Sequence, residues 1–266
     1  MLNFRNEFDK YVEKYNLKDE NINRKILHTY RVTDNCVKIA KNLKLKKEQI
    51  KVAEFIGIFH DIARFEQYQK YGTFNDLESF DHGEYAIKIL EENRFVINFT
   101  RDERIASLIK KAISNHNKYV IEENLGKEER IYAKIIRDAD KIDILNETNN
   151  IFFRDKKDEI ENGYISEYIL DSIKKEKTIK RRTNLCQLEK LLVYIAFVFD
   201  LNYDYSFELL NEQVSILKIL EKYQFKNLKT KQDIENIKRI IKRYLEQNFP
   251  CEEEKWKLNM DWLCSK

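Results

Sequence analysis

Histidine is scarce in this chain, and each histidine lies in a different predicted helical segment. The 266 residues contain four histidines, which are His28, His60, His82 and His116. His116 continues an apolar helical stripe by a step of four, and Asp140 continues another stripe in the same way. His60 and Asp61 lie in EFIGIFHDIARF, the most apolar predicted helix. One histidine on an apolar face is usually a core residue, whereas four with two aspartates indicate a shared site.

The His60-Asp61 pair needs a compensating partner, because burying a carboxylate among Phe and Ile is costly without one. A metal ion is a partner that imidazoles and carboxylates can share. These ligands suit Zn, Fe, Mn, Co or Ni better than Ca or Mg alone. No cysteine accompanies the cluster, which argues against a structural zinc site. Four histidines and two aspartates exceed the needs of one four-coordinate ion, so the number fits two ions bridged by one carboxylate.

The order of these residues resembles the HD superfamily of metal-dependent phosphohydrolases. The strings HTYRV at 28–32, HDIAR at 60–64 and RDADKID at 137–143 are similar to the motifs of this family. The chain has Ala63 where the family often has glycine. The strings YGTFND and IAFVFDLNY also resemble parts of a bacterial HD subgroup. The resemblance implies an all-α HD-domain helical bundle.

The same resemblance implies the first metal site. His28, the doublet His60-Asp61 and Asp140 match the motif that holds the first ion in the family. We therefore expect these four side chains to converge within coordination distance of one ion, about 2.0–2.2 Å.

The resemblance also implies a second ion. His82 and His116 match the two extra histidines of binuclear members, in which the doublet aspartate, here Asp61, bridges the ions. Two ions about 3.5–4 Å apart can share a hydroxide and clamp a phosphoryl oxygen. The expected cofactor is a divalent transition metal, as two ions of Mn, Co, Ni, Fe or Zn.

Two arginines are predicted to bind the substrate phosphate. Arg64 follows Asp61 by three residues, and Arg31 follows His28 by three, so each points to the same side of its helix as a ligand. Guanidinium groups bind phosphate in a bidentate way. We predict catalytic roles for Asp61, Arg64 and Arg31. Asp143, one turn after Asp140, is expected to be a helix-surface partner.

The segment 67–81 is predicted to be a loop near the mouth of the metal site, because it separates two ligand-bearing helices. Its candidates for gripping a base or sugar are Tyr71, Thr73, Phe74 and Asn75. Asp81 is expected to cap the following helix, with Glu84 completing a capping box.

Helical periodicity runs through almost the whole chain. With 5 Gly and 1 Pro, the chain lacks the turn residues that a β-sandwich or an α/β fold needs. The predicted helices cover 7–14, 24–43, 48–66, 82–93, 102–119, 127–146, 164–178, 185–200, 206–222 and 231–248. We predict an HD metal-binding helical core at 1–150 and a helical extension packed on it at 151–266. The apolar run LLVYIAFVF is predicted to be a buried core helix.

The composition indicates a cytoplasmic, reduced protein. The net charge is +3, which gives no strong nucleic-acid signal, and the four cysteines form no CxxC pair. No signal peptide and no membrane-spanning stretch is apparent. The basic segment 174–182 is interpreted as a solvated helix end, or else as an anion-attracting rim. The sequence leaves open whether the protein forms a homo-oligomer.

The predicted activity is metal-dependent hydrolysis of phosphate esters, with a nucleotide or related small phosphorylated compound as substrate. A phosphomonoesterase and a phosphodiesterase both remain open. One alternative is a di-iron oxygenase, because some members of the superfamily use the same six ligands to activate O₂. Another is a regulatory module that binds nucleotide without turnover.

Overall fold

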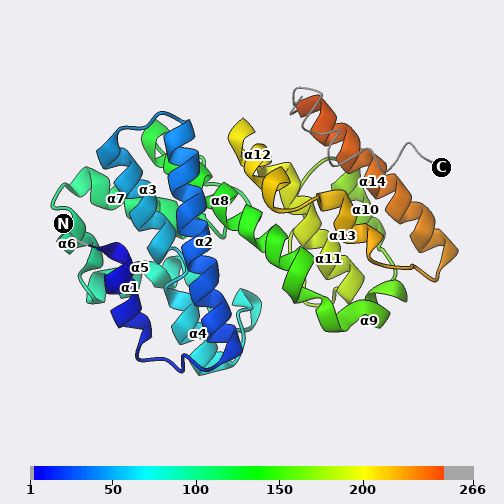
Figure 1. Cartoon of the computed structure of the whole chain (residues 1–266), viewed down its shortest axis with the longest axis horizontal. Coiled ribbons are helices and arrows are strands. Elements are labelled where there is room, and N and C mark those ends of the chain that lie inside the picture. The colour runs from blue at the N-terminus through cyan, green and yellow to red at the C-terminus, as the bar shows by residue number, and fades with distance from the viewer. Residues whose placement is uncertain (1–2, 249–266) are drawn as a thin grey trace. The chain divides into compact units, whose positions relative to one another are not determined.

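The computed structural model describes residues 3–248, and these contain helices and no strands (Figure 1). The prediction of an all-α protein is confirmed. None of the helices in the described range has the length and the apolar character needed to cross a bilayer. Cys251 and Cys264 lie outside this range.

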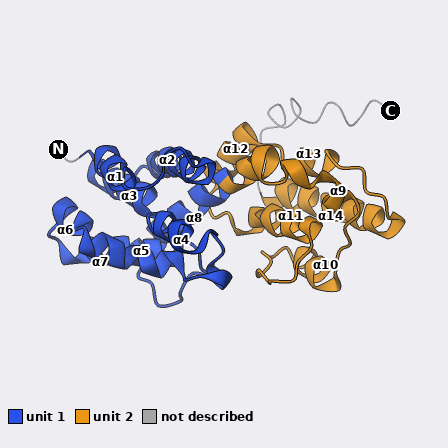
Figure 2. Cartoon of the chain, turned by 90° about the horizontal axis from the view of Figure 1, so that it is seen from below, with its two compact units in different colours: residues 1–143 blue, residues 144–266 orange. Residues whose placement is uncertain are grey.

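The chain divides into two compact units, Met1–Asp143 and Ile144–Lys266 (Figure 2). The division falls inside helix α8 (Lys127–Glu147), seven residues before the predicted boundary at 150. Every histidine of the chain therefore belongs to unit 1, together with Asp61 and Asp140.

Unit 1 is a bundle of helices around an aromatic and aliphatic core. Its helices before α8 are α1 (Phe4–Val12), α2 (Glu20–Asn42), α3 (Lys47–Phe59), α4 (Ala63–Tyr71), α5 (His82–Glu92), α6 (Phe95–Phe99) and α7 (Glu103–Asn115). α3 is the apolar helix foreseen in the sequence, and it packs against α1, α2 and α7. Phe55 and Phe59 of α3 are fully buried, which makes α3 the centre of the bundle.

Close contact between α2 and α3 depends on Gly57. A Cβ atom at this position would lie 2.8 Å from Cα of Thr33 in α2, which is closer than a side chain tolerates. The absence of a side chain lets the two backbones approach. This approach brings His28 of α2 near His60, with ring centroids 5.6 Å apart.

The predicted single helix over 48–66 is wrong, because the chain turns at residues 60–62. α3 ends at Phe59 and α4 begins at Ala63, with tight backbone hydrogen bonds from Ile62 to Phe59 and from Arg64 to Asp61. The HD doublet thus lies in the turn between two helices. α4 also extends into the predicted loop as far as Tyr71, and its C-cap is Gly72, whose φ of +67° suits a residue without Cβ.

The N-cap predicted at Asp81 is confirmed. Its side chain accepts hydrogen bonds from the backbone N–H groups of Gly83 and Glu84 at the start of α5. The Glu84 side chain pairs with Lys118 at 3.0 Å, in place of the predicted return bond to the cap. The cap fixes the start of α5, and with it the position of His82.

Unit 2 is also helical. Its helices after α8 are α9 (Lys157–Glu161), α10 (Glu167–Lys174), α11 (Gln187–Ile195), α12 (Asp204–Gln213), α13 (Ile216–Glu221) and α14 (Leu228–Asn248). A π-helical turn (Thr148–Phe152) follows α8, and a 3₁₀ segment (Ala196–Asp200) follows α11. Most of the run LLVYIAFVF is buried, as predicted, but its second half is 3₁₀. The helix predicted over 206–222 is two helices, α12 and α13.

Candidate metal centre

Six side chains meet inside unit 1, from three helices and from the ends of two others. His28 comes from the middle of α2, and Asp140 comes from α8. His60 and His116 directly follow the last residues of α3 and α7, while His82 is the first residue of α5. All four histidines and Asp61 are buried, and the side chain of Asp140 is 15% exposed. The structure therefore brings together every residue predicted as a metal ligand.

Asp61 lies at the centre, and its oxygen Oδ2 faces the first group of donors. Nε2 of His28 is 3.5 Å from this oxygen, and Nε2 of His60 is 3.6 Å from it. The same two nitrogens lie 3.2 and 3.8 Å from Oδ1 of Asp140. We call His28, His60, Asp140 and this oxygen the Oδ2 half of the cluster.

The other oxygen of Asp61 faces the second group. Nε2 of His82 is 3.2 Å from Oδ1, and Nε2 of His116 is 3.5 Å from it. The two Nε2 atoms are 2.9 Å apart. We call His82, His116 and this oxygen the Oδ1 half. One carboxylate thus presents one oxygen to each pair of imidazoles, the arrangement expected of a bridging ligand.

The outward nitrogens of two histidines are held by backbone carbonyls. Nδ1 of His60 lies 2.8 Å from the carbonyl oxygen of Gly57, and Nδ1 of His116 lies 2.6 Å from that of Ile113. A carbonyl only accepts hydrogen bonds, so Nδ1 carries the proton in both rings. In the neutral imidazole, Nε2 then directs a lone pair toward Asp61, as a metal ligand must.

The outward nitrogens of the other two histidines are held by carboxylates. Nδ1 of His28 is 2.7 Å from Oδ2 of Asp143, and Nδ1 of His82 is 2.6 Å from Oδ2 of Asp76. The expectation that Asp143 is a surface residue is wrong, since it is fully buried behind His28. Such carboxylate–histidine pairs orient metal-ligating rings and raise their basicity.

Two imidazole nitrogens of the cluster are buried without a hydrogen-bond partner, and they test whether the cluster fits a metal. These are Nε2 of His28 and Nε2 of His60. Buried polar atoms are almost always satisfied, so two unsatisfied imidazole nitrogens beside carboxylates indicate a site for a cation. The donor set is imidazole and carboxylate, which suits divalent transition metals. The residues present therefore fit such an ion.

The pKa values differ between the halves. Burial and the Lys25 charge lower the pKa of His28, but the carboxylates of Asp140, Asp143 and Asp61 outweigh them and raise it to about 10. Burial lowers the pKa of His116 to about 4, with nearby histidines acting in the same direction. Although burial alone would raise the pKa of Asp61, Lys25 and His60 hold it well below its usual range. The carboxylates that favour a proton on His28 also favour a divalent cation.

Lys25 is a cation of the site that the sequence did not predict. Its ammonium Nζ lies 2.6 Å from Oδ2 of Asp61, and its side chain is 12% exposed. It precedes His28 by three residues, so the spacing that drew attention to Arg31 would also have indicated Lys25. Lys25 thus adds a cation beside the cluster.

The two arginines predicted to bind phosphate, Arg64 and Arg31, differ in their contacts. Nη1 of Arg64 donates to Gln67, to the carbonyl of Phe74 and to Asp76, while its buried Nε has no hydrogen-bond partner and lies 3.5 Å from Oδ1 of Asp61. Arg31 donates two hydrogen bonds to Asp143, from Nε at 2.6 Å and from Nη2 at 2.9 Å. Arg31 therefore supports His28 through Asp143. Substrate contacts of both arginines remain predictions.

The predicted substrate loop is largely engaged in local structure. The Phe74 ring stacks on Tyr68 with centroids 4.9 Å apart, and the Thr73 hydroxyl accepts from the backbone N–H of Asn75. Asn75 caps a 3₁₀ turn (Asp76–Glu78). Tyr71 is 51% exposed. Roles for these four residues in gripping a base or sugar remain predictions.

Residues 26–145 match the sequence profile of the HD domain, and this range contains the whole cluster. This part of the chain is an HD domain. No curated protein and no solved structure matched the chain in the parallel comparisons. HD domains belong to a superfamily of metal-dependent hydrolases and bind divalent metals. The resemblance in the sequence and the cluster in the structure thus point to the same family.

Proposed function

We propose that this chain is a phosphohydrolase with a binuclear metal centre that hydrolyses phosphate esters of a nucleotide or a related small compound. One observation carries the proposal. Four imidazole Nε2 atoms surround the two oxygens of Asp61, two to each oxygen, and each ring is held from behind through Nδ1. When bound, two divalent ions supply a water that is nucleophilic near neutral pH and offset phosphoryl charge.

Two cations of the chain complete the proposal. The ammonium of Lys25 lies beside Oδ2 of Asp61, and Nε of Arg64 lies on the Oδ1 side. A phosphate at the cluster would meet one positive side chain on each side. Lys25 and Arg64 would bind the phosphate oxygens that the metals leave, and the Arg64 contacts to Asp76 and Gln67 fix its guanidinium in place.

The experiment is a substrate screen with metal-loaded protein. Metal-free protein is reconstituted with Mn, Co, Ni, Fe or Zn and assayed against phosphomonoesters, nucleotides and cyclic dinucleotides. We expect release of phosphate or a nucleotide product that chelator abolishes and that Asp61→Asn lacks. The matched control is Asp34→Asn, since Asp34 pairs with Arg5 at the surface of α2. O₂ consumption by an iron-loaded sample that releases no phosphate would instead make the chain an oxygenase.

Arg64 gives a sharper test of the phosphate contact. With the substrate found by the screen, Arg64→Ala should keep its bound metal and lose about ten- to a hundredfold in kcat/KM, the value of a charge-assisted hydrogen bond. Arg64→Lys should recover part of this loss because it keeps the charge. Loss of metal from Arg64→Ala would make Arg64 a positioning residue for Asp61 and Asp76, and unchanged kinetics would remove it from the site.

A further inference from the structure

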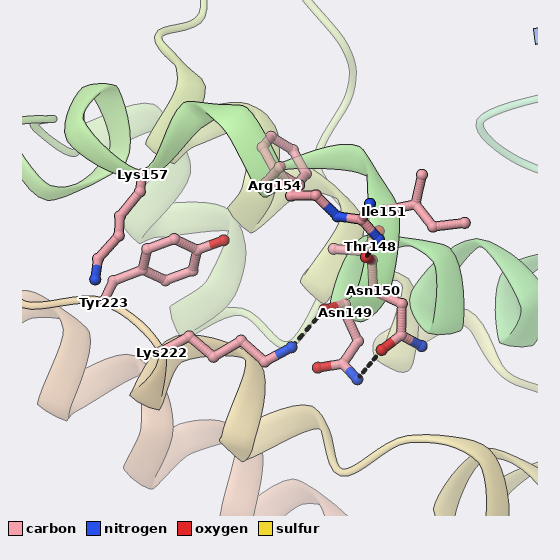
Figure 3. Close-up of a pocket in the computed structure, with 9 residues that line it drawn as sticks. Thr148, Asn149, Asn150, Ile151, Arg154, Lys157, Lys222 and Tyr223 are labelled. Carbon is pink, nitrogen blue, oxygen red and sulfur yellow. Dashed lines mark hydrogen bonds between the residues drawn. The ribbon is translucent and has the colours of Figure 1, made fainter. Parts of the chain in front are cut away.

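Unit 2 contains a cavity of about 250 Å³ that is separate in sequence from the HD cluster (Figure 3). The nine residues that line it come from two segments, 148–157 and 222–223. The first segment runs from the π-helical turn after α8 through a 3₁₀ turn (Arg154–Lys156) to the first residue of α9, and the second directly follows α13. π-helical turns are rare in proteins, and those that occur are often found at functional sites.

The lining is positively charged. It includes the cationic side chains of Arg154, Lys157 and Lys222, and it includes no carboxylate. Within residues 3–248, no carboxylate lies within ion-pairing distance of Arg154 or Lys222, and Lys157 has only a long pair with Glu161 at 3.8 Å. Three like charges around one cavity repel one another, so an anion in the cavity would be stabilised by all three.

Backbone carbonyls of the π-helical turn position two of these cations. Lys222 donates a hydrogen bond to the carbonyl of Asn149, and Nη2 of Arg154 donates to the carbonyl of Asn150 at 3.2 Å. In Figure 3 the Lys222 side chain extends toward the turn, and the Tyr223 ring points in the same direction. Burial lowers the pKa of Lys222, which is the effect of a charge that lacks a counter-ion.

We propose that this cavity binds the phosphate group of a small phosphorylated molecule. Arg154, Lys157 and Lys222 would bind the phosphate oxygens, and Tyr223 would contact the organic part. Three cations match the double charge of a phosphate better than the single charge of a carboxylate. The cavity volume of about 250 Å³ lies just below the range typical of small-molecule sites, about 300–1,000 Å³, so the ligand is no larger than about a mononucleotide. This proposal does not rest on the hydrolase activity.

Calorimetric titration of the full-length protein tests the proposal, with inorganic phosphate, AMP and adenosine as probes and with chelator present so that the HD cluster does not hydrolyse AMP. Lys222→Met should weaken the binding of phosphate or AMP by about 10–100-fold. Arg154→Gln with Lys222→Met should abolish it, and Lys222→Arg should retain it. The matched control is Lys218→Met, because Lys218 is exposed on α13 and does not line the cavity. Thermal melts of each variant report on folding.

The three probes separate the outcomes. Tighter binding of AMP than of phosphate supports a ligand with an organic part, and equal binding supports inorganic phosphate as the ligand. Binding of phosphate at the HD cluster does not depend on residues of the unit 2 cavity. Only the part of the phosphate binding that is lost in the double variant, Arg154→Gln with Lys222→Met, therefore belongs to this cavity. The proposal is overturned if that variant binds both phosphate probes like the wild type, if adenosine binds as well as AMP, or if no probe binds.

Discussion

The two halves of the cluster share one plan but differ in charge. Each half has one histidine held by a carbonyl and one held by a carboxylate. The Oδ2 half has the additional carboxylate of Asp140, whereas the Oδ1 half consists of two imidazoles and Oδ1 of Asp61. The pKa of His28 is accordingly raised to about 10 and that of His116 is lowered to about 4. With the two proposed ions bound, we expect the tighter ion in the Oδ2 half and the more open position in the Oδ1 half.

The largest effect is expected from Asp61, because it belongs to both halves. Asp61→Asn should release both ions and lower metal affinity by more than about a hundredfold, since losing an outer partner alone costs about 10–100-fold. Metal content measured by mass spectrometry, with Asp34→Asn as the control, checks this. Retention of one tightly bound ion would show that the halves are independent of the bridge.

Substitution of a histidine in the Oδ1 half is expected to remove the ion of that half alone. His82→Ala and His116→Ala should each lower the stoichiometry from two ions to one and leave the ion of the Oδ2 half in place. His28→Ala should instead weaken the tighter ion. If fully loaded His82→Ala and His116→Ala keep the wild-type metal content, the binuclear interpretation is wrong.

A smaller effect is expected from the carboxylates behind the rings. Asp143→Asn should weaken the ion of the Oδ2 half, and Asp76→Asn should weaken that of the Oδ1 half, each by about 10–100-fold. The reason is that each substitution replaces a charged acceptor of an Nδ1 proton. Competition with a chelator of known affinity measures both. Asp76 also accepts a hydrogen bond from Arg64. If Asp76→Asn weakened both ions, Arg64 would be acting on Asp61, the residue that the two halves share.

The smallest expected effect is on the pH dependence of the free energy of unfolding, and it has opposite signs for His28 and His116. The folded-state pKa of His28 exceeds its unfolded value of about 6.5, so its contribution to the free energy of unfolding is complete below pH 6.5 and is lost as pH rises toward 10. The folded-state pKa of His116 lies below 6.5, so stability is lost as pH falls from 6.5 toward 4.

Urea unfolding of metal-free protein between pH 4 and 10 measures this effect. His28→Gln should flatten the alkaline side of the stability curve, and His116→Gln should flatten the acid side. If both variants changed the slope of stability against pH on the same side of the curve, the difference in charge between the halves would be contradicted.

The sequence predicted the helical fold and the six donor residues from scarcity and spacing. Histidines on apolar stripes must be buried, and their number already suggested a shared site. The partners behind the rings were missed because they are set by tertiary contacts. Asp143 is 115 residues from His28 in sequence, and a helical pattern at 140–143 cannot show which face is covered. The helix break at 60–62 was missed because apolar periodicity continues through the turn.

The hydrogen bonds that His60 and His116 make to Gly57 and Ile113 are local, since each joins residues three apart in sequence. The carbonyls at the end of a helix lack partners within the helix, and these two histidines use them. The orientation of these two rings therefore depends on the ends of α3 and α7, whereas the orientation of His28 depends on the contact of α2 with Asp143 of α8. A substitution that shifts α8 against α2 would thus reorient His28 and leave the Nδ1 contacts of His60 and His116 in place.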